Sequence, residues 1–212
     1  MAAMRAWAAT AALLGACALL AAGCGGAKKA ASAPPAPAKP VCAHKAGWQK
    51  LANRIKAPVY CPSWLPDPLS GQIGAVDNNI NSVSSDRSYL ESWVWQDTDL
   101  GGTSGELHVN LRGYPGRHTI PLCTTGGIGS RVVPCFANPN GKVDLAGIHA
   151  TMYTVNQDAD EWHIALVWRA YGGLYTVSEH VAPPLTADHV IRYLRHELRD
   201  LVVIKPAPKQ QV

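Results

Sequence analysis

Apolar and polar residues alternate along two stretches of the chain, a pattern typical of half-buried β-strands. In residues 107–112, apolar side chains occupy every second position, with His108, Asn110 and Arg112 between them. In residues 162–169, the alternate apolar positions are Trp162, Ile164, Leu166 and Trp168. Strands of a parallel sheet, which are buried on both faces, read as continuous apolar runs instead. The alternation therefore favours an antiparallel sheet.

Glycine-containing segments beside these stretches predict the turns between strands. Tyr114-Pro115-Gly116 follows the first stretch, and Gly172-Gly173 leads the second into a further strand over 174–178. Residues 138–141 contain Asn-Gly, a strong signal for a hairpin turn. We therefore expect short strands connected by hairpins.

Two segments carry apolar residues at helical spacing. The first is 43–55, where one face is formed by Trp48, Leu51, Ala52 and Ile55, and Pro58 follows it. The second begins after Thr186, a favourable N-cap, and is expected to extend to about Val203. Its apolar stripe consists of Ile191, Leu194, Leu198 and Leu201. The predicted fold class is α+β: an antiparallel sheet of hairpin-connected strands with an N-terminal helix and a C-terminal amphipathic helix packed on it.

The first 24 residues have the layout of a secretory signal peptide. Arg5 is the only charge before an apolar run over 6–22, and small residues then lead into Cys24. Because a cysteine at this point resembles a bacterial lipoprotein signal, we expect Cys24 to carry a lipid with acyl chains such as palmitate. One alternative is a cut at the upstream Cys17. Another is an uncleaved membrane anchor, for which the run is short and rich in alanine.

Composition divides the chain into a signal peptide (1–23), a tether, a domain and a tail. Residues 24–40 are almost entirely Ala, Pro, Gly, Lys and Ser, so we expect a disordered tether that favours polyproline conformations. Residues 41–205 contain enough apolar residues for a single extracytoplasmic domain, and 206–212 are expected to be a disordered tail. The predicted location is the cell membrane, lipid-anchored and facing outside the cytoplasm.

Four cysteines lie in the predicted domain, an even number that is typical of disulfides in an exported chain. Pairing of nearest neighbours gives Cys42–Cys61 and Cys123–Cys135, although two other connectivities are open. A metal site is the alternative, but the chain has no C-x-x-C pair and no histidine at zinc-finger spacing. We therefore expect two disulfides and no bound metal.

The formal net charge of the full chain is +4, which is too small and too dispersed for a nucleic-acid-binding surface. The densest basic stretch lies near the C-terminus, and Glu197 and Asp200 occur within it. Its basic residues are Arg192, Arg195, His196 and Arg199. We expect a solvated helix face here, and no nucleic-acid partner.

No motif of a catalytic or cofactor site is complete in this sequence. His196-Glu197 begins like a zinc-protease helix, but the second histidine of H-E-x-x-H is missing. Two glycine-rich segments, 101–105 and 127–130, lack the lysine of a phosphate-binding loop and the glycine spacing of a dinucleotide site. A Ser-His-Asp triad stays open, because the fold brings its members together. We expect no catalytic residue and no cofactor.

Aromatic usage is unusual, with seven tryptophans and one phenylalanine. Trp93 and Trp95 are two residues apart and so share a strand face, as do Trp162 and Trp168. These four side chains either form an aromatic platform for a sugar ring or a lipid, or fill the core in place of phenylalanine.

The two ends of the domain carry recognisable sequence features. Residues 59–66 read Val-Tyr-Cys-Pro-Ser-Trp-Leu-Pro, and the other end has a strand with Trp168, a glycine turn, residues 174–177 and a helix from Thr186. These features resemble a family of extracytoplasmic domains of unknown function, found in bacterial lipoproteins and beside membrane anti-sigma factors. The middle of the domain does not match that family. The resemblance implies no catalytic residues and agrees with an α+β fold.

The sequence favours a membrane-anchored, surface-exposed or periplasmic lipoprotein that acts as a non-enzymatic binding, sensing or adaptor module. One alternative is a carrier of an apolar ligand or lipid, which needs a cavity beside the tryptophans. Another is a cell-envelope hydrolase, which needs Ser, His and carboxylate side chains together in a cleft. The expected partners are the membrane, through the lipid, and an envelope protein or an apolar small molecule.

Overall fold

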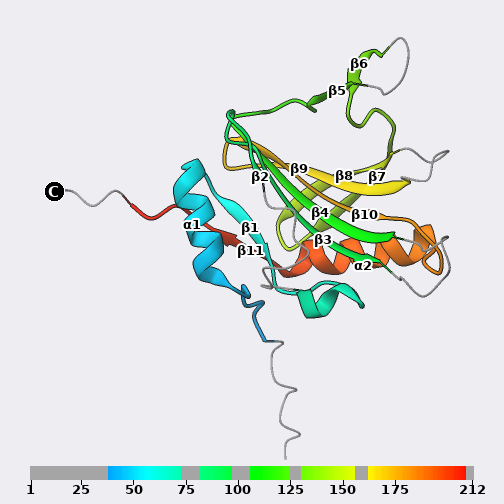
Figure 1. Cartoon of the computed structure of the whole chain (residues 1–212), viewed down its shortest axis with the longest axis horizontal. Coiled ribbons are helices and arrows are strands. Elements are labelled where there is room, and N and C mark those ends of the chain that lie inside the picture. Colours follow the sequence, from blue (N-terminus) through cyan, green and yellow to red (C-terminus); the bar gives the residue numbers. More distant parts are fainter. Residues whose placement is uncertain (1–37, 73–81, 97–105, 125–129, 156–161, 209–212) are drawn as a thin grey trace, which may run out of the picture. The chain divides into compact units, whose positions relative to one another are not determined.

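An antiparallel sheet of seven strands is the largest element of the domain (Figure 1). The computed structural model describes residues 38–72, 82–96, 106–124, 130–155 and 162–208. Within this part of the chain, the strand order is β2-β3-β4-β10-β9-β8-β7, and all neighbours are antiparallel. The strands are β2 (Ser82–Val83), β3 (Tyr89–Gln96), β4 (Glu106–Pro115), β10 (Gly173–His180), β9 (His163–Ala170), β8 (Ile148–Val155) and β7 (Pro139–Leu145).

Smaller elements complete the domain, which forms one compact unit over Ala38–Val212. Strands β1 (Val59–Pro62) and β11 (Leu201–Ile204) pair with each other, and so do β5 (Leu122–Thr124) and β6 (Val132–Pro134). The helices are α1 (Lys45–Ile55), a short 3-10 helix η1 (Leu69–Gln72) and α2 (Ala187–Asp200). The described chain is therefore α+β and mostly antiparallel sheet, as the alternation of residues predicts. None of its helices combines the length and the apolar character that crossing a membrane requires.

The alternation within each strand separates the two faces of the sheet. On one face, alternate residues of β4 and β9 join the helices in the main core: Leu107, Val109, Leu111, Ile164, Leu166 and Trp168. On the other face, Ala165, Val167 and Leu174 form a smaller cluster with side chains that include Phe136 and Tyr153. Residues Ile164–Trp168 of β9 are thus buried on both faces, because Ala165 and Val167 between the alternate core positions are also apolar.

Helix α2 begins as expected but ends earlier. The hydroxyl of Thr186 accepts a hydrogen bond from the backbone N–H of His189, which forms the N-cap. The helix stops at Asp200, and Leu201 belongs to β11, so the prediction of a helix to about Val203 was wrong. Residues 202–204 are Val-Val-Ile, and β-branched side chains favour the extended conformation when a partner strand is present. Strand β1 supplies that partner.

The Asn-Gly pair at Asn140-Gly141 lies inside β7 and does not form the predicted turn. The register of β7 against β8 shifts between Pro139 and Gly141, which is a β-bulge. The hairpin turn between these strands is made by Ala146 and Gly147, with φ angles of 50° and 78°. A Cβ atom at Gly141 would lie 2.9 Å from the Cε of Met152, so the end of the methionine side chain occupies the space beside this glycine.

Both expected disulfides are present. Cys42 bonds to Cys61 with a Cα–Cα distance of 5.6 Å, and Cys123 bonds to Cys135 with a Cα–Cα distance of 4.9 Å. The first disulfide joins the start of the domain to β1, and the second closes the β5–β6 hairpin.

We expect Leu198→Ala to destabilise the domain by about 2–5 kcal/mol, because Leu198 of α2 is fully buried in the main core. For a domain of this size the melting temperature then falls by roughly 5–15 °C, measured by circular dichroism. Arg195→Ala on the exposed side of α2 is the control, with a change within about 0.5 kcal/mol. A silent Leu198→Ala would show that α2 does not pack on the sheet as described.

Candidate functional site

Three arginines lie on one exposed side of α2, beside a groove. Arg192, Arg195 and Arg199 are exposed, and at 100° per residue they lie within about 60° of the helix circumference. The opposite side of the helix is buried and consists of Val190, Leu194, Glu197 and Leu198. Because the buried residues fix the rotation of the helix, all three guanidinium groups point away from the core.

A shallow groove of about 300 Å³ lies along this side of α2. It is lined by Leu145 at the end of β7 and by Arg192, Arg195, His196 and Arg199. Within the described chain, neither Arg192 nor Arg195 forms an ion pair or a hydrogen bond. We call these four basic side chains the basic face.

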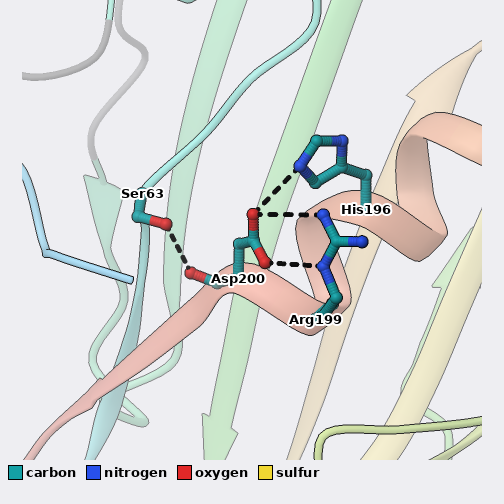
Figure 2. Close-up of polar contacts among 4 residues, drawn as sticks. All are labelled: Ser63, His196, Arg199 and Asp200. Atoms are coloured by element: carbon teal, nitrogen blue, oxygen red, sulfur yellow. Dashed lines mark hydrogen bonds and ion pairs between the residues drawn. The ribbon is translucent and has the colours of Figure 1, made fainter. Parts of the chain in front are cut away.

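Asp200 organises one end of the basic face (Figure 2). One carboxylate oxygen lies 2.8 Å from the Arg199 Nε, and the other lies 3.0 Å from the His196 Nε2. The hydrogen bond from Arg199, followed by smaller effects of the neighbouring charges, holds the pKa of Asp200 below its usual range. Three guanidinium groups against one carboxylate leave the basic face with a charge of +2, even when His196 is neutral.

Trp64 packs against the same end of α2. Its ring stacks on His196 with a centroid distance of 3.9 Å and an angle of 9° between the planes, and it meets Tyr193 edge-on at 5.9 Å. Trp64 comes two residues after β1, whose last pair with β11 joins Pro62 to Leu201. The β1–β11 pairing therefore places Trp64 beside the helix.

Ser63, His196 and Asp200 lie close together, but they do not form a catalytic triad. The Ser63 hydroxyl donates a hydrogen bond of 2.8 Å to the backbone carbonyl oxygen of Asp200 (Figure 2). In a triad, the serine hydroxyl donates to the histidine and the carboxylate orients that histidine. Here the Ser63 hydroxyl donates instead to a backbone carbonyl oxygen, which is too weak a base to remove the proton. The cluster thus ties β1 to the end of α2.

The sequence places Glu197 among the arginines, but in the structure its side chain faces the core. Glu197 is 1% exposed and Glu179 of β10 is 0% exposed, and neither carboxyl has a hydrogen-bond partner among the described residues. Burial raises the pKa of Glu179 to about 9. Burial, together with the neighbouring Glu179, also raises the pKa of Glu197 well above its usual range. Both side chains are therefore protonated at neutral pH, and the interior carries no charge there.

Three histidines on adjacent strands form a second polar cluster. His108, His163 and His180 come from β4, β9 and β10, and their ring centroids are 4.5 to 5.2 Å apart. The Nε2 atoms of His108 and His163 are 2.5 Å apart, while the His180 ring stacks on both others. In the described part of the chain, no group of three or more His, Cys, Asp or Glu side chains is arranged to hold a metal ion.

The four tryptophans of the possible platform lie in or against the main core. Trp93 and Trp168 are each 3% exposed, and Trp95 and Trp162 pack against the core while partly buried. Trp93 contacts Trp48, and Trp168 contacts Tyr60.

Cys24, the predicted lipid attachment site, lies outside the described residues, as do the signal peptide and most of the tether.

Comparisons with protein-family models, with curated proteins and with solved structures find no significant match for this chain. The arguments for function therefore rest on the residues and contacts described above.

We expect the domain to become less stable as the pH rises from about 4.5 to about 9. The two buried glutamates stay protonated in the folded state, whereas in the unfolded chain they ionise near their ordinary pKa of 4.5. For Glu179, each pH unit between these two pKa values costs the folded state about 1.4 kcal/mol as an upper bound, and Glu197 acts in the same direction. The half-buried Glu91, whose pKa burial raises to about 7, acts in the same direction.

Urea unfolding at about pH 5 and about pH 8 measures this effect. Glu197→Gln keeps the size of the side chain but cannot ionise, so its free energy of unfolding should fall less between the two pH values than that of the wild type. Asp188→Asn changes an exposed carboxyl on the same helix and should leave the pH dependence unchanged. Equal pH dependence in Glu197→Gln and the wild type would contradict a protonated Glu197.

Proposed function

We propose that this protein is a lipid-anchored binding module of the cell envelope, without a catalytic role, and that its basic face binds an anionic partner. The observation that carries the proposal is the orientation of α2. Glu197 is buried, so among the described residues Asp200 is the one carboxylate that contacts any of the three arginines lining the groove. In this proposal α2 is an amphipathic helix packed on the sheet, as the sequence predicts, with its polar side available for binding.

Guanidinium groups suit such a role because they present planar arrays of N–H donors that match carboxylate and phosphate oxygens. Arg199 is already held by Asp200, while Arg192 and Arg195 have no such partner in the described chain. Two unpaired arginines beside the 300 Å³ groove thus favour an anionic group as the occupant. The anchor in this proposal is the lipid on Cys24, attached after removal of the signal peptide and followed by the tether 24–40.

The structure offers less support for the two alternative functions. A second cavity, of about 180 Å³, is lined by residues that include Tyr60, Trp168 and Tyr171. Pockets for small molecules usually measure about 300–1,000 Å³, so this cavity is small for an apolar carrier. For a hydrolase, the Ser63 hydroxyl would have to face His196, but it donates to the Asp200 carbonyl.

We expect Cys24→Ser to release the protein from the membrane or to leave its signal peptide uncut. Two or more acyl chains anchor a protein stably, because each buried methylene contributes about 0.8 kcal/mol. Membrane fractionation followed by mass spectrometry of the N-terminal peptide measures both outcomes. Cys17→Ser is the matched control and should leave anchoring intact. A Cys24→Ser protein that is still processed and membrane-bound would contradict the proposed anchor.

Binding of an anionic partner through the basic face predicts retention on immobilised heparin, a polyanion. Arg192→Gln/Arg195→Gln should elute at a lower salt concentration than the wild type. Arg112→Gln/Lys142→Gln removes the same charge and should elute like the wild type. Arg112 and Lys142 are exposed and follow the opposite alternation to the core residues Leu111 and Val143, so they lie on the other face of the sheet. Equal elution of the two double variants would contradict a role for the basic face.

A further inference from the structure

We infer that the basic face binds the anionic phospholipid headgroups of the membrane in which the Cys24 lipid is inserted. This inference rests on the proposed anchoring and names the partner of the proposed binding surface. Three observations support it: the position at which the tether enters the domain, the distribution of charge along the chain, and the aromatic side chains beside the arginines.

The first disulfide brings the tether to the basic face. Cys42, the second residue after the tether, is bonded to Cys61, and Ser63 two residues later binds Asp200 at the end of α2. At about 3.3 Å per residue along the strand, Cys42 therefore lies within roughly 20 Å of Asp200. The chain that leads to the lipid therefore enters the domain within about that distance of one end of the basic face.

The tether is also short. Cys24 precedes Cys42 by 18 positions, so even a fully extended chain spans at most about 60 Å. The anchored domain is thus confined to a thin layer above the bilayer. Phospholipid headgroups of the same membrane are then present at high local concentration, because tethering makes the second contact intramolecular.

Charge is distributed unequally along the chain. From Cys24 to Pro66 there are seven lysines and arginines and no aspartate or glutamate. From Asp67 to Val212 there are eleven basic and fifteen acidic residues, so this larger part is net negative. Within that part, the basic face gathers three of the arginines, and its Asp200 end lies within roughly 20 Å of the point where the basic N-terminal segment enters. Both features favour an anionic surface close to the anchor.

Aromatic side chains border the arginines. Trp64 and Tyr193 are partly exposed, and Trp64 stacks on His196 of the basic face. Tryptophan and tyrosine are enriched where proteins meet the headgroup region of a bilayer, because their rings are apolar and their N–H or O–H groups are polar.

The test uses the mature chain, residues 24–212, with Cys24→Ser, so that no acyl chain contributes to binding. Flotation with vesicles of phosphatidylcholine alone, or of phosphatidylcholine mixed with phosphatidylglycerol, measures the binding constant. We expect binding to the anionic vesicles that weakens as salt increases, and much weaker binding to the neutral vesicles. Each basic residue near an anionic surface strengthens binding about fivefold, so Arg192→Gln/Arg195→Gln should weaken it about 25-fold.

Arg112→Gln/Lys142→Gln, with the same loss of charge on the other face of the sheet, should stay within about twofold of the parent chain. Equal weakening in both double variants, or equal binding to the two vesicle types, would overturn the inference. Heparin retention without binding to phosphatidylglycerol vesicles would overturn it too, while leaving the proposed function standing. Conversely, an unmodified Cys24 in the native protein would refute the anchor independently of the vesicle result.

Discussion

Antiparallel pairing of β1 with β11 holds together the parts of the domain on which the basic face depends. Four residue pairs join a strand near the start of the domain to the strand that ends it. Because Leu201 enters this ladder, α2 has to stop at Asp200. The two residues that follow β1 then reach the end of α2: Ser63 binds the Asp200 carbonyl, and Trp64 stacks on His196. The Cys42–Cys61 disulfide joins the incoming chain to the same strand.

Patterns within one element predicted much of the fold. The alternation in β4 and β9, the apolar face of α1, the N-cap at Thr186 and the nearest-neighbour disulfides all depend on residues close in sequence. Features that depend on distant partners were missed. The end of α2 requires β1, which lies more than 130 residues earlier in the chain. The Asn140-Gly141 pair becomes a bulge because β8 pairs along β7 through that position.

In the candidate site too, the sequence predicted what depends on neighbouring residues and missed what depends on distant contacts. The sequence identifies Arg192, Arg195, His196 and Arg199 as the densest basic stretch, but it counts Glu197 among them. The apolar stripe extended to Leu201 in the sequence, whereas the buried side in the structure is formed by Val190, Leu194, Glu197 and Leu198. The buried side of α2 thus includes Glu197 in place of Leu201, and the surface that remains exposed is more positive than the sequence suggests. A protonated carboxyl is compatible with the core in a way that a charged one is not, and no local pattern indicates which form a glutamate will take.

The bulge in β7 has a consequence for how copies of the protein meet one another. Strand β7 ends the order of the described sheet, so its outer edge has no neighbouring strand there. Unpaired edges of this kind can join the sheets of separate molecules, and such encounters would be frequent if the proposed lipid anchor holds the molecules in a common plane. Pro139 has no N–H to offer, the shift before Gly141 breaks the regular spacing, and the exposed Lys142 brings charge to the edge. These features oppose edge-to-edge association between copies of the protein, including at the high local concentration that the proposed anchor would create.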